Sequence, residues 1–245
     1  MNSEILGKTI ERLSTAKNAD EAFFIFSQAV AQYGFDRVSY TLCTDHISLG
    51  LPKKHGLSTS YPEDWMKFYQ EKKYMDVDPV VDTVFKTRLP FFWDHVTNKF
   101  DKNTSQYKMM KEAEDAGLAE GICIPVNNGV DELTGIGVAR SKRICVNDYK
   151  VMAEINLLSL FFHETFRGLI QKPPTIFLTQ KEKDVLSWAA EGKVDDDIAS
   201  LMNISFHTVR FHWKNIFSKL NVYNKMQAVA KAIRLCLIVP GRITY

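Results

Sequence analysis

The chain has 245 residues, of which 45% are hydrophobic and 24% are charged, a composition typical of a folded globular protein of one or two domains. It has no apolar run of about eighteen residues and no apolar segment at its N-terminus, so we expect neither a transmembrane span nor a signal peptide. We therefore expect a cytoplasmic protein. The net charge of +2 is unequally distributed, because residues 177–245 carry +4 and the rest of the chain carries −2. A basic C-terminal part on a slightly acidic protein is typical of nucleic-acid binding.

The four cysteines are far apart in the sequence, and no two of them form a CxxC pair. This spacing indicates reduced thiols in the core rather than a disulfide framework or a zinc site. They are Cys43, Cys123, Cys145 and Cys236. We therefore expect no bound metal.

Helical and extended patterns alternate through the first 170 residues. In chain order they first predict a helix over 20–32 that ends at Gly34, a strand over 37–44, and short helices after Tyr61-Pro62 and after Asp78-Pro79. A helix over 105–116 that stops at Gly117 follows. Next come strands over 120–126 and 132–141, and a helix over 148–169 capped by Asn147. Residues 127–131 between the two late strands carry a hairpin signal. Helices flanking an antiparallel sheet predict an α+β fold with an N-terminal α/β/α sandwich.

The helix predicted over 148–169 has more apolar surface than one stripe. The residues that share one face are Val151, Ile155, Leu158, Phe162 and Phe166. Met152 and Phe161 widen this surface, so we expect the helix to pack on both the sheet and a partner subunit. Two prolines within 171–175 then disfavour helix and strand. We expect one domain over 1–170, a linker over 171–176 and a second domain over 177–245.

The two late strands have unlike faces, because side chains alternate along a strand. One face carries the branched residues Ile122, Ile124, Val126, Ile136 and Val138, and the other carries the small residues Gly121, Cys123, Gly135, Gly137 and Ala139. Glycine in a strand often marks the close approach of a ligand, although a bulky helix could fill the same space. Upstream aromatic residues favour a ligand, because Tyr61, Trp65 and Tyr69 recur at steps of four.

The C-terminal part reads as helix, turn and helix between Leu178 and Leu220. Ser205 ends the turn over 202–205 and can cap the next helix, because its side-chain oxygen can accept a backbone N–H. That helix, over 206–220, has an apolar stripe of Val209, Trp213, Ile216 and Leu220, with Arg210, His212, Lys214 and Lys219 outside it. A basic outward face on the second helix is typical of an all-α helix-turn-helix domain that reads DNA.

This segment resembles the DNA-binding domain of the LuxR-type regulators. The match includes Glu182 and Leu186, which would form one turn of a packed helix, and Gly192, which would be its left-handed C-terminal stop. The resemblance implies that Arg210 and Lys214 read base edges. The other DNA-binding residues that it implies are Lys193, Thr208, His212 and Lys219.

One position of this domain departs from the family pattern. Where a threonine usually follows the Gly-Lys pair, this chain has Val194, and three aspartates follow over 195–197. Carboxylates suit a helix N-terminus but repel phosphate groups. We therefore expect either weaker DNA binding or a helix cap that moves to Asp195.

The N-terminal part resembles the ligand-binding domain of acyl-homoserine-lactone receptors of the same family. Six positions typical of that pocket match, namely Trp65, Tyr69, Asp78, Pro79, Trp93 and Gly121. The resemblance implies that Trp93 donates to the lactone carbonyl, Asp78 accepts from the amide N–H and Tyr61 binds the amide carbonyl, while Trp65 and Tyr69 wall the ligand. Asp78 before Pro79 also suits an N-cap with proline at the first helical position.

Gly137 departs from the ligand-binding pattern, in which a serine or threonine is common. That hydroxyl usually supports the ligand's amide or a substituent near it. We expect its absence to widen the pocket, which would then accept a bulky, branched, aromatic or long acyl group.

The resemblance implies a quorum-sensing transcriptional regulator without a cofactor. It would bind an N-acyl-homoserine lactone and, as a homodimer, a palindromic operator in double-stranded DNA, with RNA polymerase as a further partner. A receptor without a cognate synthase that senses a different small molecule is an alternative. We disfavour an enzyme, because no nucleophile elbow, metal motif or phosphate loop accompanies Asp78 and His95. The first half also lacks the alternating βα pattern of a response-regulator receiver.

Overall fold

The computed structural model describes residues 3–46, 50–127, 132–144, 147–170 and 176–241. These residues divide into two compact units, one ending at residue 170 and the other beginning at residue 176. Residues 171–175 of the predicted linker (171–176) and residues 128–131 of the predicted hairpin turn lie outside the described residues. In the ranges given above, no helix is both long and apolar enough to cross a membrane.

The first unit is built on an antiparallel sheet with the strand order β2-β1-β5-β4-β3. The strands are β1 (Arg37–Leu42), β2 (Lys54–Thr59), β3 (Phe91–Phe92), β4 (Glu120–Asn127) and β5 (Leu133–Arg140). In the central pair, Cys123 lies opposite Gly137 and Ile124 lies opposite Ile136. Small residues therefore meet small residues on one face, and branched residues meet branched residues on the other.

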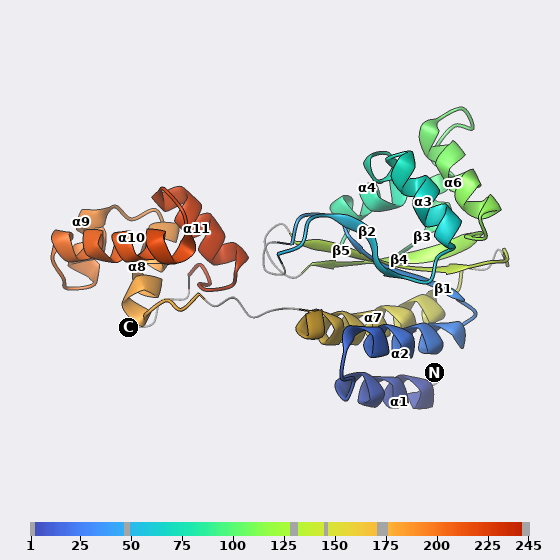
Figure 1. Ribbon diagram of the computed structural model, residues 1–245, viewed down its shortest axis with the longest axis horizontal. Coiled ribbons are helices and arrows are strands. Elements are labelled where there is room, and N and C mark those ends of the chain that lie inside the picture. The colour runs from blue at the N-terminus through green and yellow to red at the C-terminus, as the bar shows by residue number, and fades with distance from the viewer. Residues whose placement is uncertain (1–2, 47–49, 128–131, 145–146, 171–175, 242–245) are drawn as a thin grey trace. The chain divides into compact units, whose positions relative to one another are not determined.

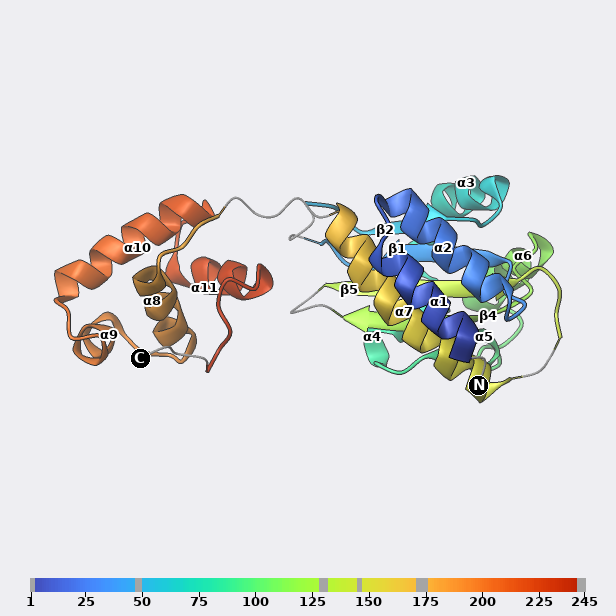
Figure 2. The same ribbon diagram turned by 90° about the horizontal axis from the view of Figure 1, so that it is seen from below.

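Helices cover both faces of this sheet, as Figures 1 and 2 show. The layer on the branched face consists of α2 (Ala19–Ala31) and α7 (Tyr149–Ile170), and α1 (Ser3–Ser14) packs on their outer side. On the opposite side lie α3 (Glu63–Glu71), the short 3-10 helix η1 (Tyr74–Asp76), α4 (Pro79–Lys86), α5 (Trp93–Thr97) and α6 (Ser105–Asp115). The predicted α/β/α sandwich is confirmed.

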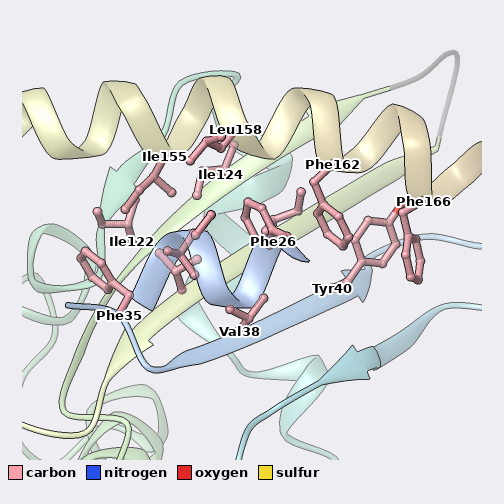
Figure 3. Close-up of a cluster of buried hydrophobic side chains, with 14 of the residues drawn as sticks. Phe26, Phe35, Val38, Tyr40, Ile122, Ile124, Ile155, Leu158, Phe162 and Phe166 are labelled. Carbon is pink, nitrogen blue, oxygen red and sulfur yellow. The ribbon is translucent and has the colours of Figure 1, made fainter. Parts of the chain in front are cut away.

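Two separate apolar clusters lie on the two faces of the sheet. The branched residues of β4 and β5 pack with Phe26 of α2 and Phe162 of α7, whose rings stack with centroids 4.4 Å apart (Figure 3). Trp93, Cys123 and Ala139 belong to the second cluster, together with aromatic side chains of α3. The predicted difference between the two faces is therefore confirmed.

Several elements differ from the sequence prediction. The pattern predicts neither α1, β2, β3 nor α5, and β1 ends at Leu42 rather than at residue 44. Asn147 is not the cap of α7, because the Asp148 carboxylate accepts the backbone N–H groups of Lys150 and Val151 at 2.9 and 3.1 Å. The Asn147 side-chain amide instead lies 3.2 Å from Nε2 of His95.

The second unit contains α8 (Gln180–Ala190), α9 (Asp195–Leu201), α10 (Phe206–Leu220) and α11 (Lys225–Arg234), of which α11 is absent from the sequence prediction. The helix-turn-helix consists of α9, the turn over 202–205 and α10. Ser205 caps α10, since its hydroxyl accepts the N–H of Thr208 at 3.1 Å. Gly192 follows α8 with φ +79°, which confirms the left-handed stop. The four residues of the apolar stripe on α10 are buried in this unit.

The cysteines only partly follow the expectation of four core thiols. Cys43 and Cys123 are buried and free. Cys236 is exposed, so its assignment to the core is wrong: it follows the end of α11 in a left-handed conformation with φ +51°. Cys145 lies outside the described residues.

Candidate functional site

A cavity of about 50 Å³ lies between the small-residue face of the sheet and the helices above it. The sequence-predicted residues that line it are Tyr61, Trp65, Tyr69, Asp78, Trp93 and Gly137. Pro79 and Gly121, the other two predicted ligand residues, are not part of its lining. Pro79 occupies the first position of α4, where a missing N–H costs nothing. A cavity of this size holds only a few water molecules, so side chains must shift to admit a larger ligand.

The two oxygens of the Asp78 carboxylate accept hydrogen bonds from two different parts of the protein, the first turn of α4 and the side chain of Tyr69. Its Oδ1 accepts the backbone N–H groups of Val80 and Val81 at 2.7 and 3.3 Å, which caps α4. Its Oδ2 accepts the hydroxyl of Tyr69 at 2.8 Å on the cavity side. Burial raises the pKa of the Asp78 carboxyl, and these hydrogen bonds act in the opposite direction. The N-cap interpretation is therefore confirmed, and Oδ2 is the oxygen that the cap leaves for Tyr69, another residue of the cavity lining.

Trp93 presents a buried donor in the lining of the same cavity. The side chain is 6% exposed, and its indole N–H has no hydrogen-bond partner among the described residues. Gly121 explains how the indole fits there: a Cβ atom at position 121 would lie 2.7 Å from Cε2 of Trp93 and 2.7 Å from the carbonyl oxygen of Val138. Gly121 thus lets the indole lie directly against β4, and its role is to position Trp93.

The space above Gly137 is not open. A Cβ atom at this position would lie 2.6 Å from the hydroxyl oxygen of Tyr61. The expectation that the missing side chain widens the cavity is therefore wrong in this structure, because the phenol of Tyr61, which lies between β2 and α3, fills the gap. Burial raises the pKa of the Tyr61 phenol well above its usual value, so the hydroxyl is protonated at neutral pH and can donate a hydrogen bond.

Other cavity residues are not among the predicted ligand-binding residues. They are Ser39, Thr41, Cys43, His55, Val80, Val81, Val84, Met109, Met110, Ala113, Leu118, Cys123 and Gly135. Cys123 and Gly135 lie on the small-residue face that the strand alternation predicts, whereas His55 lies in the unpredicted strand β2. Its imidazole stacks on the ring of Tyr69 with centroids 4.1 Å apart. Burial lowers the pKa of His55 to about 4, so the ring is neutral.

The basic side chains of the second unit differ in whether they are exposed or already held in an ion pair. Arg210 and Lys214 are exposed one turn apart on α10, and Lys193 is exposed between α8 and α9. Lys219 instead donates to both carboxylate oxygens of the buried Glu182, at 2.7 and 2.9 Å. This ion pair joins α10 to the first turn of α8, so Lys219 already has a role within the unit.

Two further DNA-binding residues of the prediction are half-buried. The Thr208 hydroxyl lies 2.8 Å from that of Ser205, within the capping turn of α10. The His212 side chain lies between the exposed and buried faces of the same helix. Neither has the open exposure of Arg210 and Lys214.

The expected cap at Asp195 is not what the structure shows. The N-cap of α9 is Val194, which makes no side-chain capping bond. Asp195 instead accepts the indole N–H of Trp213 at 2.9 Å and the ammonium of Lys225 at 2.6 Å. Its charge is therefore compensated inside the unit, whereas Asp196 and Asp197 are exposed.

The comparisons with known proteins assign both units. Residues 18–166 match the autoinducer binding domain, and residues 177–232 match the domain of the luxR family of bacterial regulatory proteins. The chain belongs to the LuxR family. The regulator is 31% identical to the HTH-type quorum sensing-dependent transcriptional regulator RpaR of Rhodopseudomonas palustris, over 87% of this chain and 86% of that protein. It is 33% identical to the transcriptional activator LuxR of Aliivibrio fischeri, over 71% of each chain.

The fold of the regulator agrees with a solved structure of the same family. The crystal structure of Escherichia coli SdiA superposes with a TM-score of 0.77 at 25% identity, covering 96% of this chain and 98% of that chain. The chain is thus a transcriptional regulator with an autoinducer-binding domain and a helix-turn-helix DNA-binding domain, and it is not an enzyme.

Proposed function

We propose that the regulator binds an N-acyl-homoserine lactone in the cavity against the small-residue face of the sheet. One observation carries this proposal: a buried N–H of Trp93 without a described partner lies in the same cavity wall as the buried Oδ2 of Asp78. A buried donor without a partner loses the hydrogen bonds it makes to water in the unfolded chain. A ligand with a carbonyl and an amide N–H satisfies both groups.

The rest of the cavity fits the remaining parts of such a ligand. The lactone carbonyl would accept from Trp93, the amide N–H would donate to Asp78, and the amide carbonyl would accept from the Tyr61 hydroxyl. The wall is otherwise dominated by aliphatic, aromatic and sulfur-containing side chains, which suit an acyl chain. Two relatives are named as quorum-sensing regulators, which agrees with a small-molecule signal as the ligand.

The regulator would bind DNA as a homodimer through α10. Leu157, Leu160 and Phe161 on α7 are each at least 40% exposed, and their spacing places them on one outer face of that helix. A second copy packed there would bring two α10 helices to a palindromic operator, with half-sites about one helical turn apart. Arg210 and Lys214 would read base edges, and Lys193 would lie near phosphate. We infer that the protein acts in the cytoplasm, with RNA polymerase as a further partner.

Thermal unfolding with a panel of acyl-homoserine lactones tests the ligand class. At a hundredfold excess over the dissociation constant, a bound ligand stabilises the folded protein by about 2.7 kcal/mol. Trp93→Phe, which removes the donor and keeps an aromatic ring, should lose most of this gain. If no lactone in the panel stabilises the wild type, the ligand class is wrong. Mass spectrometry of whatever co-purifies would then identify another small molecule, in favour of a receptor without a cognate synthase.

A further inference from the structure

His55 stands where two hollows of the first unit meet. It lines the inner cavity and also an outer cleft of about 640 Å³ between β2 and α3. Tyr61 and Tyr69 are the other residues that line both. A ligand whose head lies at Trp93 and whose acyl group extends toward the outer cleft would therefore pass the side chains of these three residues, the imidazole among them.

The imidazole is held in one orientation from two sides. One face stacks on Tyr69 with an interplanar angle of 17°, and Nδ1 lies 3.2 Å from the hydroxyl oxygen of Thr41. That hydroxyl also accepts the N–H of Gly56 at 3.3 Å. Gly56 has φ +61°, and a Cβ atom there would lie 2.5 Å from Cε of Met66, so the backbone of β2 approaches α3 closely at this point. The direction of the free ring edge is thus set by the fold.

The free edge of the ring carries Nε2, the second ring nitrogen. Nε2 is buried, and none of the described residues forms a hydrogen bond with it. A neutral imidazole has one donor and one acceptor nitrogen, so Nε2 can donate or accept according to the tautomer. The nearby hydroxyls of Ser39 and Thr41 lie 3.3 Å from one another and already interact. A buried polar atom of this kind favours any ligand that supplies its partner.

We infer that His55 is a specificity-determining residue that selects acyl groups carrying a hydrogen-bonding oxygen, either a keto or a hydroxyl group, beyond the amide. The inference rests on the proposed lactone ligand. The position follows from Tyr69, whose hydroxyl donates to the amide-binding carboxylate of Asp78 while its ring stacks on His55. His55 therefore lies one aromatic ring away from the amide site. An unsubstituted acyl chain would leave Nε2 unpaired, and an oxygen at this depth would satisfy it.

Matched pairs of lactones that differ by one oxygen test this inference. Each pair has the same acyl skeleton, with and without a keto or hydroxyl group, and dissociation constants are measured by calorimetric titration. In the wild type, at least one oxygenated lactone should bind about tenfold more tightly than its partner, as expected for one hydrogen bond. His55→Phe keeps a ring on Tyr69 and should reduce this ratio to near one.

Two further variants keep the result interpretable. Gln70→Ala alters a residue that lines only the outer cleft and should leave the ratio unchanged. Thr41→Val removes the anchor of Nδ1 and should lower the ratio even if His55→Phe folds poorly. A ratio that His55→Phe and Thr41→Val leave unchanged, or a wild type that prefers no oxygenated lactone, overturns the role of His55 and leaves the lactone proposal intact. Failure of every lactone to bind overturns both.

Discussion

Asp78→Asn separates the two tasks that the Asp78 carboxylate performs. The amide oxygen can replace Oδ1 as acceptor for the N–H groups of Val80 and Val81, because asparagine and aspartate cap helices about equally well. The amide nitrogen then takes the place of Oδ2, where it presents a donor to the ligand's N–H. The substitution therefore keeps the helix cap and removes the acceptor at the cavity.

The expected effect on binding follows from the loss of a charged acceptor. A hydrogen bond to a charged group contributes about 1.5–3 kcal/mol, so the affinity for a lactone should fall roughly 10- to 150-fold. The stability of the ligand-free protein should change by less than about 0.5 kcal/mol, since the cap survives and the Tyr69 hydroxyl can accept from the new amide. Burial raises the pKa of Asp78, and the neutral amide also removes the cost of a buried charge.

Asp78→Ala is the matched control. It removes both the cap and the cavity acceptor, so it should cost about 0.5–2 kcal/mol of stability in addition to the loss of binding. Thermal unfolding of the ligand-free variants measures stability, and calorimetric titration with the tightest-binding lactone of the panel measures affinity. If Asp78→Asn binds that lactone within twofold of the wild type while Asp78→Ala is destabilised, Asp78 is a helix cap only.

Three other substitutions test the remaining assignments. Gly121→Ala should weaken lactone binding at least tenfold, because the added methyl displaces the indole of Trp93, and an unchanged affinity in titration would disprove that positioning role. Lys219→Ala should destabilise the DNA-binding unit by about 1–3 kcal/mol by leaving a buried carboxylate without its counter-charge, as measured by chemical denaturation; equal stability would show that the ion pair contributes nothing. Arg210→Ala should cost about 1–3 kcal/mol on the operator and relax one base position in each half-site. Lys193→Ala should weaken binding to all sequences alike, so a selection experiment in which both variants keep the wild-type preference would contradict the Arg210 assignment.

Local patterns account for the parts of the fold that sequence reasoning predicted. The recognition helix α10 begins and ends where its amphipathic stripe and its Ser205 cap predict. The two faces of β4 and β5 follow from strict alternation, which does not depend on the rest of the chain. The pocket residues Trp65 and Tyr69 share one face of α3, as their spacing of four residues predicts.

Long-range contacts account for what the sequence could not predict. The strand β2 contains a glycine with positive φ and no alternation of polar and apolar residues, so neither the strand nor His55 could be assigned to the site. The space above Gly137 is filled by Tyr61, which is distant in sequence and reaches it only through the folded sheet. The pairing of Lys219 with Glu182 likewise joins two helices whose relative position no local pattern specifies.

The two faces of the sheet divide the first unit into parts on which selection acts differently. The cluster that α1, α2 and α7 form with the branched face is complete from the protein's own side chains, including the stacked rings of Phe26 and Phe162. Substitutions in this cluster change the fraction of folded protein and hence the cellular abundance of the regulator, and this effect does not depend on which ligand it binds. The opposite cluster contains the cavity and the unpaired nitrogens of Trp93 and His55. Under the proposed function, substitutions among these residues change which ligand the regulator binds, while the cluster on the branched face stays as it is.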